Sequence, residues 1–250
     1  MKTKWKFTLV VFGLLLLYAS TLVFKYYNPG PAKIISVTYN PKDVSISLFW
    51  KNEKGELFSN IESLHLYLDE KNKNLLFAMN AGMFDKAQHP IGLYIQNGEI
   101  LKKLNTKKFI PKGDETIPNF YLQPNGIFYI TESNEAEICE TSKFPTNLPV
   151  KFATQSGPML LVNGEVNTIF KPGSRNYFIR NGLGITPDKK LIFAISENRV
   201  NFYDFAKFFK DQGCTDALFL DGYVSKAFIP EKNIFQTDGE LGVLIGITKN

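Results

Sequence analysis

A helix, a glycine stop, a buried strand and a carboxylate follow one another between residues 201 and 221. This unit constrains the fold more than any other stretch of the chain. Its helical part is defined by apolar residues at helical spacing: Phe202, Phe205, Ala206 and Phe209. Asn201 is placed to cap this helix, Asp204 follows in the manner of a capping box, and Gly213 can end it. The sequence therefore predicts a helix that leads directly into the next element.

That next element is the apolar run Ala217–Leu220, which reads as a buried strand. It stops abruptly at Asp221 and Gly222, so its end delivers a carboxylate to the edge of a sheet. Loops at such edges commonly carry the chemistry of α/β-type proteins.

Most of the remaining chain consists of short strand-like runs separated by turn signals. The expected strands are Ile34–Val37, Val44–Trp50, Leu75–Met79, Gly92–Ile95, Asn119–Leu122, Ile127–Thr131, Phe152–Gln155, Met159–Val162, Tyr177–Ile179, Leu191–Ser196 and Leu241–Ile247. Asn97-Gly98 and Asn163-Gly164 are typical hairpin turns. A second helix is expected around Ile61–Leu68. The predicted class is α+β: a strand-rich mixed sheet with two main helices.

The N-terminus predicts a transmembrane helix ahead of this domain. Three lysines precede an uncharged apolar run from Phe7 to Phe24, and a run of about eighteen residues is long enough to span a bilayer. No Ala-x-Ala site follows, although a cleaved signal peptide stays the rival interpretation. We therefore expect residues 1–25 to be an anchor or signal, 26–32 a linker, and 33–250 a single extracytoplasmic domain, periplasmic or at the cell surface.

Composition restricts the partners. The net charge of +5 comes largely from dispersed lysines, and no arginine-rich helix or aromatic RNA-binding signature occurs, so nucleic acid is not an expected partner. An anionic substrate or membrane surface would suit a basic protein. The two cysteines, Cys139 and Cys214, are too few for a thiolate zinc site and are expected to be unpaired structural residues.

Polar side chains end five of the apolar runs. They are Asn80, Gln155, Arg180, Glu197 and Asp221. Singly, each has a structural explanation: a tight turn, a bonded backbone group, or an ion pair of Arg180 with Asp221 or Glu197. If the strands share one sheet, however, their ends converge, and nearby glycines let backbone approach a ligand closely. The repetition predicts one site that combines amides, a guanidinium and a carboxylate.

The motifs around these residues resemble the phosphodiester glycosidase family, in particular its bacterial exported branch. The matching segments, in order, are Asn80–Phe84, Gly92–Tyr94, Asn119–Gly126, Gln155–Leu160, Arg180–Gly184 and Leu220–Gly222 with Ser225. The family includes the lysosomal uncovering enzyme, which removes N-acetylglucosamine from a phosphodiester. After the aspartate that enzyme type usually has Gly-Gly-Gly-Ser, whereas this chain has Gly222-Tyr223-Val224-Ser225, so its substrate is not carried over.

The resemblance implies hydrolysis of a sugar 1-phosphodiester, and the residue types fit that chemistry. Cleavage at an anomeric carbon needs a carboxylate, for which Asp221 is the first choice, Glu197 the reserve and Asp85 the third. Arg180 can hold the phosphate. The other expected substrate contacts are Asn80, Gly82, Gln155, Ser156, Gly157, Gly222 and Ser225. No cofactor is expected; the alternative is a hard divalent cation bound by Asp221 and Glu197.

Two alternatives stay open. One is a serine hydrolase built from Ser156, His89 and Asp221, against which the absence of Gly-x-Ser-x-Gly argues. The other is an anchored glycan- or envelope-binding protein that has the cleft but no turnover. The expected partners are thus a glycosyl-phosphate or polysaccharide substrate and, through the N-terminal helix, a membrane.

Overall fold

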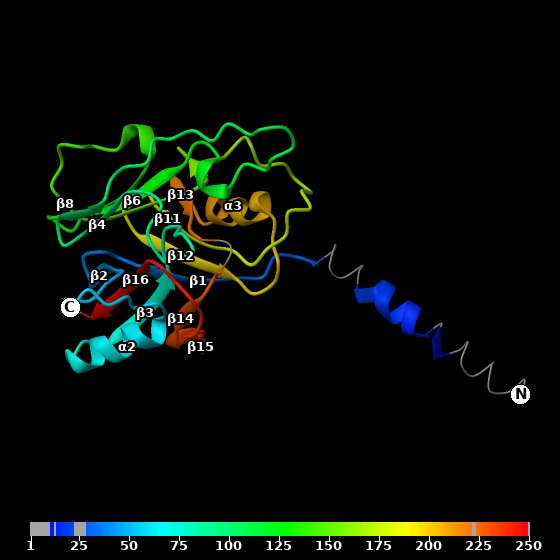
Figure 1. Ribbon diagram of the computed structural model, residues 1–250, viewed down its shortest axis with the longest axis horizontal. Coiled ribbons are helices and arrows are strands. Elements are labelled where there is room, and N and C mark those ends of the chain that lie inside the picture. The colour runs from blue at the N-terminus through cyan, green and yellow to red at the C-terminus, as the bar shows by residue number, and fades with distance from the viewer. Residues whose placement is uncertain (1–10, 13, 23–28, 222–223, 250) are drawn as a thin grey trace, which may run out of the picture.

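Three antiparallel sheets and two ten-residue helices make up the folded part of the chain (Figure 1). The structure is a computed structural model that describes residues 11, 12, 14–22, 29–221 and 224–249. Every strand pairing in these ranges is antiparallel. The α+β class is thus confirmed, but the expected mixed sheet is wrong, because the strands join by hairpins and longer returns without parallel crossovers.

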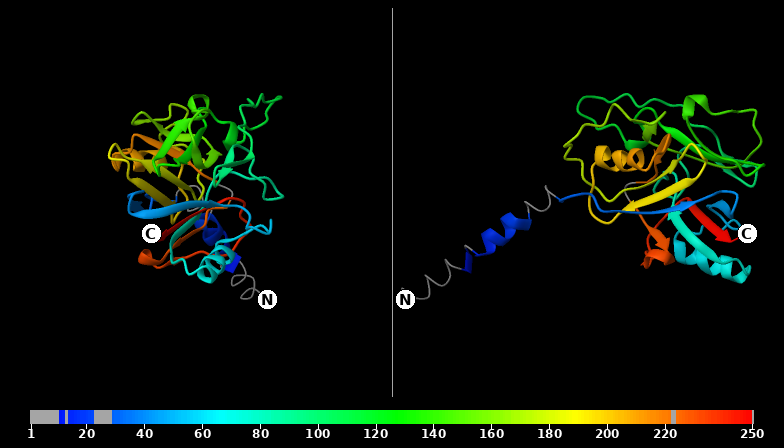
Figure 2. Two further views of the ribbon diagram at one scale, coloured as in Figure 1. Left: turned by 90° about the vertical axis from the view of Figure 1, so that its left-hand side faces the viewer. Right: turned by 180° about the vertical axis from the view of Figure 1, so that it is seen from behind.

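The first sheet has six strands. Their order is β1 (Ile34–Tyr39), β12 (Leu191–Ser196), β11 (Asn181–Ile185), β13 (Asp216–Phe219), β9 (Met159–Val162) and β10 (Glu165–Val166). Helix α3 (Phe202–Asp211) covers one face of this sheet, as both views of Figure 2 show.

The other two sheets have five strands each. The second has the order β15 (Ile234–Phe235), β14 (Ala227–Ile229), β3 (Leu75–Asn80), β16 (Leu244–Lys249) and β2 (Val44–Phe49). Helix α2 (Ile61–Glu70) packs on it. The third has the order β5 (Glu99–Lys102), β4 (Tyr94–Gln96), β8 (Val150–Ser156), β6 (Gly126–Thr131) and β7 (Ala136–Glu140).

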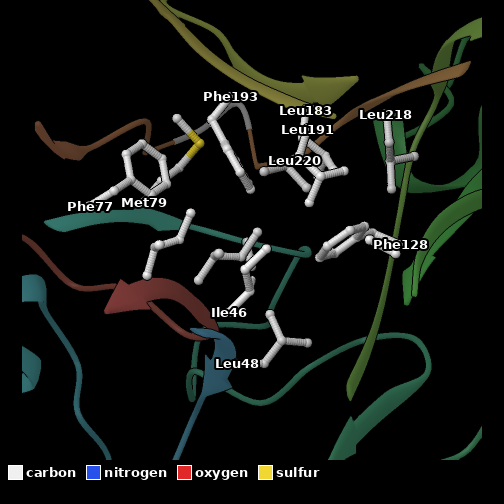
Figure 3. Close-up of a cluster of buried hydrophobic side chains, with 14 of the residues drawn as sticks. Ile46, Leu48, Phe77, Met79, Phe128, Leu183, Leu191, Phe193, Leu218 and Leu220 are labelled. Atoms are coloured by element: carbon white, nitrogen blue, oxygen red, sulfur yellow. The ribbon is translucent and has the colours of Figure 1, made fainter. Parts of the chain in front are cut away.

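One buried cluster joins all three sheets. Figure 3 shows side chains of all three sheets in this cluster, among them Leu183 and Leu218 of the first, Phe77 and Met79 of the second, and Phe128 of the third. A second cluster lies under α3 and is rich in phenylalanine, including Phe202, Phe205, Phe209 and Phe219. The three sheets thus share one core, and the single domain over 33–250 stays a prediction.

Local signals in the sequence determined both helices and two turns. Asn201 caps α3 by accepting a hydrogen bond from the Asp204 amide at 2.8 Å, and Gly213 beyond the helix has a φ of +77°. Both residues of the Asn97-Gly98 and Asn163-Gly164 turns have positive φ, as a type I′ hairpin requires. These predictions are confirmed.

Two predicted strands are wrong. Asn119–Leu122 contains a short 3-10 helix, Asn119–Tyr121, between Pro118 and Pro124, whose fixed φ and missing N–H groups do not suit a ladder. Tyr177–Ile179 contributes only an isolated bridge between Phe178 and Val200. The strand begins later, at Asn181. Its Gly182 allows close packing, since an added Cβ there would lie 2.8 Å from the Leu218 carbonyl oxygen.

The cysteines are free thiols, as expected, with Cys214 buried and Cys139 half-buried. Burial raises the pKa of each to about 12. Neither thiol is therefore activated at neutral pH.

The predicted anchor, residues 1–25, falls partly outside the described residues, which omit 1–10, 13 and 23–28. Residues 11, 12 and 14–22 are helical, and their large apolar side chains are exposed. Within the described ranges, no helix is both long and apolar enough to cross a membrane. The chain enters the domain at Pro29–Lys33, where the Asn198 side-chain amide donates to the carbonyls of Pro29 and Pro31.

Candidate active site

Arg180 and Asp221 come from neighbouring strands of the first sheet. Strand β11 pairs with β13 so that Gly182 lies opposite Phe219, and the Leu220 amide donates to the Asn181 carbonyl at 3.2 Å. Arg180 directly precedes β11 and Asp221 follows β13, so the antiparallel pairing brings the backbones of these two residues to the same end of the sheet.

The guanidinium of Arg180 is buried and held in place. The residue is 1% exposed, and its guanidinium carbon lies 3.5 Å from the centroid of the Phe202 ring. Nε donates to the Val200 carbonyl at 2.9 Å, and Nη2 donates to the carbonyl and side-chain oxygens of Asn176. These contacts fix the plane of the guanidinium and use two of its three nitrogens.

The charge of Arg180 has no acidic partner in the described part of the chain. The predicted structural ion pair with Asp221 or Glu197 is absent from the salt bridges of these residues. Burial lowers the pKa of Arg180 to about 9. Nη1 donates to no described residue, and no fully buried side-chain nitrogen there lacks a partner, so Nη1 borders accessible space. An anion in that space would supply the missing counter-charge.

Asn80 is a junction between the first two sheets. It is fully buried, and its side-chain oxygen accepts from the Lys226 amide at 2.9 Å and from Asn181 Nδ2 at 3.0 Å. Its Nδ2 lies 3.5 Å from the Asp221 carbonyl oxygen. Asn80 therefore lies beside the backbone of Asp221, although its strand belongs to the second sheet and not to the one sheet that the prediction assumed, and it positions the backbone there through this network.

Ser225 contacts the same carbonyl. Its hydroxyl donates to the Asp221 carbonyl at 3.1 Å and lies 3.4 Å from the side-chain oxygen of Asn181. Asp221 itself is 8% exposed. Gly222 and Tyr223 lie outside the described residues, so the predicted role of Gly222 stays a prediction.

Gln155 is saturated by contacts within the protein. Its Oε1 accepts from the amides of Leu93 and Asn105, and its Nε2 donates to the Asn105 carbonyl and the Thr141 hydroxyl. A carboxamide has two donors and a carbonyl with two lone pairs, so no group is left for a ligand. This geometry favours a positioning role for Gln155 over direct contact with substrate.

Ser156 and the two site glycines hold strands close together. The Ser156 hydroxyl donates to the Leu220 carbonyl at 3.1 Å, one residue before Asp221. An added Cβ at Gly82 would lie 2.6 Å from the Gln155 carbonyl oxygen, and one at Gly157 would lie 2.6 Å from Asn125 Cβ. Ser156 thus joins the third sheet to the end of β13, while Gly82 packs the segment after β3 on β8 and Gly157 packs on the residue before β6.

The serine hydrolase alternative does not fit these contacts. The Ser156 hydroxyl is completely buried and bonded to a backbone carbonyl. The His89 side chain is about half exposed, and its Nδ1 lies 3.6 Å from Asp85. The described geometry therefore lacks the serine–histidine contact that this mechanism needs.

The reserve carboxylates lie in other settings. Glu197 is exposed at the end of β12, where its amide donates to the Lys33 carbonyl. Asp85 accepts hydrogen bonds from the amides of Ala87 and His89; although burial raises its pKa, these bonds lower it below its ordinary value overall. Within the described ranges, no group of three or more His, Cys, Asp and Glu residues is arranged to hold a metal ion.

Sequence reasoning missed three residues of this region: Asn176, Asn181 and Phe202. Asn181 bonds Asn80, while Phe202 and Asn176 hold Arg180. Asn181 lies next to Arg180 in the motif Arg180–Gly184. The signal available in the sequence was a polar residue directly before a glycine-containing apolar run. Phe202 fits the helical apolar pattern equally well, so no signal separated it from the core.

Comparison with known proteins identifies the family of this chain. The family model described as phosphodiester glycosidase matches residues 73–243, which include Asn80, Gln155, Arg180 and Asp221. The chain belongs to the phosphodiester glycosidase family. It is also 33% identical over 193 residues to the uncharacterized protein YigE of Escherichia coli (strain K12), covering 77% of this chain and 72% of that protein.

Several solved structures have a fold similar to that of this chain. The catalytic domain of zebrafish N-acetylglucosamine-1-phosphodiester alpha-N-acetylglucosaminidase, auto-inhibited by its pro-peptide, matches with a TM-score of 0.59 at 14% identity, over 90% of this chain and 86% of that one. A hypothetical protein from Synechocystis matches with a TM-score of 0.56 at 14% identity, over 88% and 59%. A candidate exported protein from Burkholderia pseudomallei K96243 matches with a TM-score of 0.56 at 10% identity, over 86% and 73%. At these identities the likeness shows the fold alone.

Proposed function

We propose that this member of the phosphodiester glycosidase family hydrolyses a glycosyl phosphodiester, with Asp221 as the catalytic carboxylate and Arg180 as the phosphate-binding residue. Water adds across the bond between the anomeric carbon and the phosphate oxygen. The sugar leaves with the hydroxyl of water, and the phosphate leaves as a monoester.

The observation that carries the proposal is the buried charge of Arg180, which has no acidic partner among the residues that the structure describes. A buried guanidinium without a carboxylate is costly, and a bound phosphate would offset that cost. Phe202 and the two carbonyl acceptors hold the group so that Nη1 is left for the ligand. Preorganised donors of this kind stabilise charge on a leaving phosphate without reorganisation.

Asp221 is suited to the anomeric carbon because it follows β13, and β13 pairs with β11, the strand that Arg180 directly precedes. A carboxylate there stabilises an oxocarbenium-like transition state or activates the attacking water. Asn80 and Ser225 support its backbone, whereas Gln155, Ser156, Gly82 and Gly157 position the strands around it. Glu197 is the reserve carboxylate.

The proposed location is outside the cytoplasm, with the N-terminal segment as a membrane anchor. Support comes from the lysines at positions 2, 4 and 6, the apolar run behind them, and the exposed apolar side chains of the described helical residues. The similar fold of a candidate exported protein agrees with this location. The substrate would then be an envelope or exported polysaccharide component.

The test is incubation of the protein with a panel of sugar 1-phosphodiesters, followed by mass spectrometry of released sugar. Wild-type protein should release sugar, and Asp221→Asn should bind the same diester but lose turnover by at least about a hundredfold, the order expected for loss of a catalytic acid or base. Release should persist in EDTA, because the proposed reaction uses no metal. Loss of activity in EDTA would instead indicate a divalent cation.

The alternative is a binding protein without turnover. It predicts that a diester raises the melting temperature of wild-type and Asp221→Asn protein alike, with no product from either. A folded wild-type protein that binds the panel and releases nothing would favour this alternative.

A further inference from the structure

Phe178 is an exposed aromatic residue beside a buried cation. Phe178 lies two positions before Arg180 in the sequence, and it is 53% exposed. The guanidinium carbon of Arg180 lies 5.7 Å from the centroid of its ring. An aromatic face beside a cation that has no acidic partner among the described residues suits a ligand that combines an anionic group with an apolar face.

The backbone of Phe178 is fixed, unlike that of an ordinary surface loop. Its amide donates to the Val200 carbonyl at 3.2 Å, and its carbonyl accepts from the Val200 amide at 2.8 Å. The preceding carbonyl, that of Tyr177, accepts from Arg199 Nε at 3.0 Å. The ring is therefore presented on a segment that is tied to the same residue, Val200, that accepts a hydrogen bond from Arg180.

We infer that Phe178 and Arg180 form a two-part site in which the guanidinium holds a phosphate and the Phe178 ring stacks against the pyranose attached to it. The inference rests on the proposed function, because it assigns the substrate of that same site as a sugar phosphate with an apolar ring face. The C–H groups of a pyranose carry partial positive charge, and the face of an aromatic ring carries negative charge. Phe178 is thus the residue that separates sugar phosphates from simple phosphates.

Binding by calorimetry tests the inference independently of turnover. The probes are methyl phosphate and the 1-phosphates of glucose, mannose, galactose and N-acetylglucosamine. Wild-type protein should bind at least one sugar phosphate about three- to tenfold more tightly than methyl phosphate, the order that one aromatic contact contributes. Phe178→Ala should abolish this preference, so that the sugar phosphates and methyl phosphate bind with similar affinity, and Phe178→Trp should restore it.

Phe235 provides a matched control. It is 59% exposed, lies on β15 of the second sheet, and contacts the Phe228 ring at 5.7 Å. Phe235→Ala should keep the wild-type preference, which separates the effect from a general loss of an exposed phenylalanine.

Several outcomes would overturn the inference. These are no preference for any sugar phosphate in the wild type, an unchanged preference in Phe178→Ala, or an equal loss of methyl phosphate binding. Failure of the proposed hydrolysis is distinguishable: it would appear as sugar phosphate binding that depends on Phe178 without cleavage of any diester. Cleavage that is unaffected by Phe178→Ala would retain the hydrolase and remove the stacking role.

Discussion

The guanidinium of Arg180 stacks on the ring of Phe202, with 3.5 Å between the guanidinium carbon and the ring centroid. Arg180 belongs to the segment that leads into β11, and Phe202 begins α3, so the contact joins the sheet to the helix that covers it. The Phe202 ring makes a cation–π contact with the flat face of the buried guanidinium. The charge of Arg180 has no acidic partner among the described residues.

Inorganic phosphate should therefore stabilise the wild-type protein. Because burial lowers the pKa of Arg180 to about 9, the group is charged below that pH and neutral above it, so the phosphate-induced rise in melting temperature should be present at pH 7 and lost as the pH rises past about 9. Arg180→Lys should weaken phosphate binding about tenfold or more, since lysine lacks the planar fork. Equal stabilisation of both proteins at both pH values would show that phosphate binds elsewhere.

Asn80→Ala should reduce both stability and activity. It removes the acceptor of the Lys226 amide, at a cost of about 2 kcal/mol in the free energy of unfolding, and releases the backbone of Asp221. Asn167 is the matched control: it is also buried, and its Nδ2 donates to the Met159 carbonyl. Urea denaturation should give a similar loss for Asn167→Ala, and turnover of its folded fraction should stay at the wild-type level. A similar loss of turnover in the two folded proteins would remove the specific role of Asn80.

Gly82→Ala should be destabilising because its new Cβ would lie 2.1 Å from Thr154 Oγ1 and 2.6 Å from a backbone oxygen. Overpacking of this kind costs about 3 kcal/mol. Gly213→Ala is the control: its Cβ meets nothing within 4 Å, and only its φ of +77° opposes the change, at about 1 kcal/mol. Thermal unfolding should rank the variants in this order, and the reverse order would contradict the close approach of the strands.

Asp216→Asn should stabilise the protein at pH 7. Burial, with Glu137 and Glu140 nearby, raises the pKa of Asp216 above its ordinary 3.8 despite hydrogen bonds that oppose this shift. The folded state thus holds this proton more tightly than the unfolded state, so the penalty is present above the folded pKa and disappears as the pH falls below 3.8. The melting temperature should rise by about 1–2 °C at pH 7, the order that a few tenths of a kcal/mol gives.

Asp188→Asn is the opposite case and serves as the control for Asp216→Asn. The hydrogen bond from Lys190 lowers the pKa of Asp188, so removing this carboxylate should not stabilise the protein at pH 7. A rise for both variants would indicate a general effect of net charge.

Predictions that depend on neighbouring residues succeeded. The caps and apolar spacing of α3, the turns at Asn97 and Asn163, and the motif order that indicates the family are all properties of short segments. Pairing across long distances failed, as the expected mixed sheet and the misplaced strand at Tyr177–Ile179 show. A short apolar run shows that it is buried but not which strand lies beside it.

The sequence by itself determined that an arginine, an aspartate and several amides follow apolar runs in one order of motifs, and hence the family to which the chain belongs. Only the tertiary structure decided what each side chain does there. In the folded protein, the side chain of Gln155 makes all its hydrogen bonds internally, and Asn80 and Asn181 join two sheets. Arg180 is buried against Phe202 and has no acidic partner among the described residues. The physical reason is that hydrogen-bond partners and burial arise between strands far apart in the chain, whereas helical period, caps and turns are fixed by residues a few positions apart.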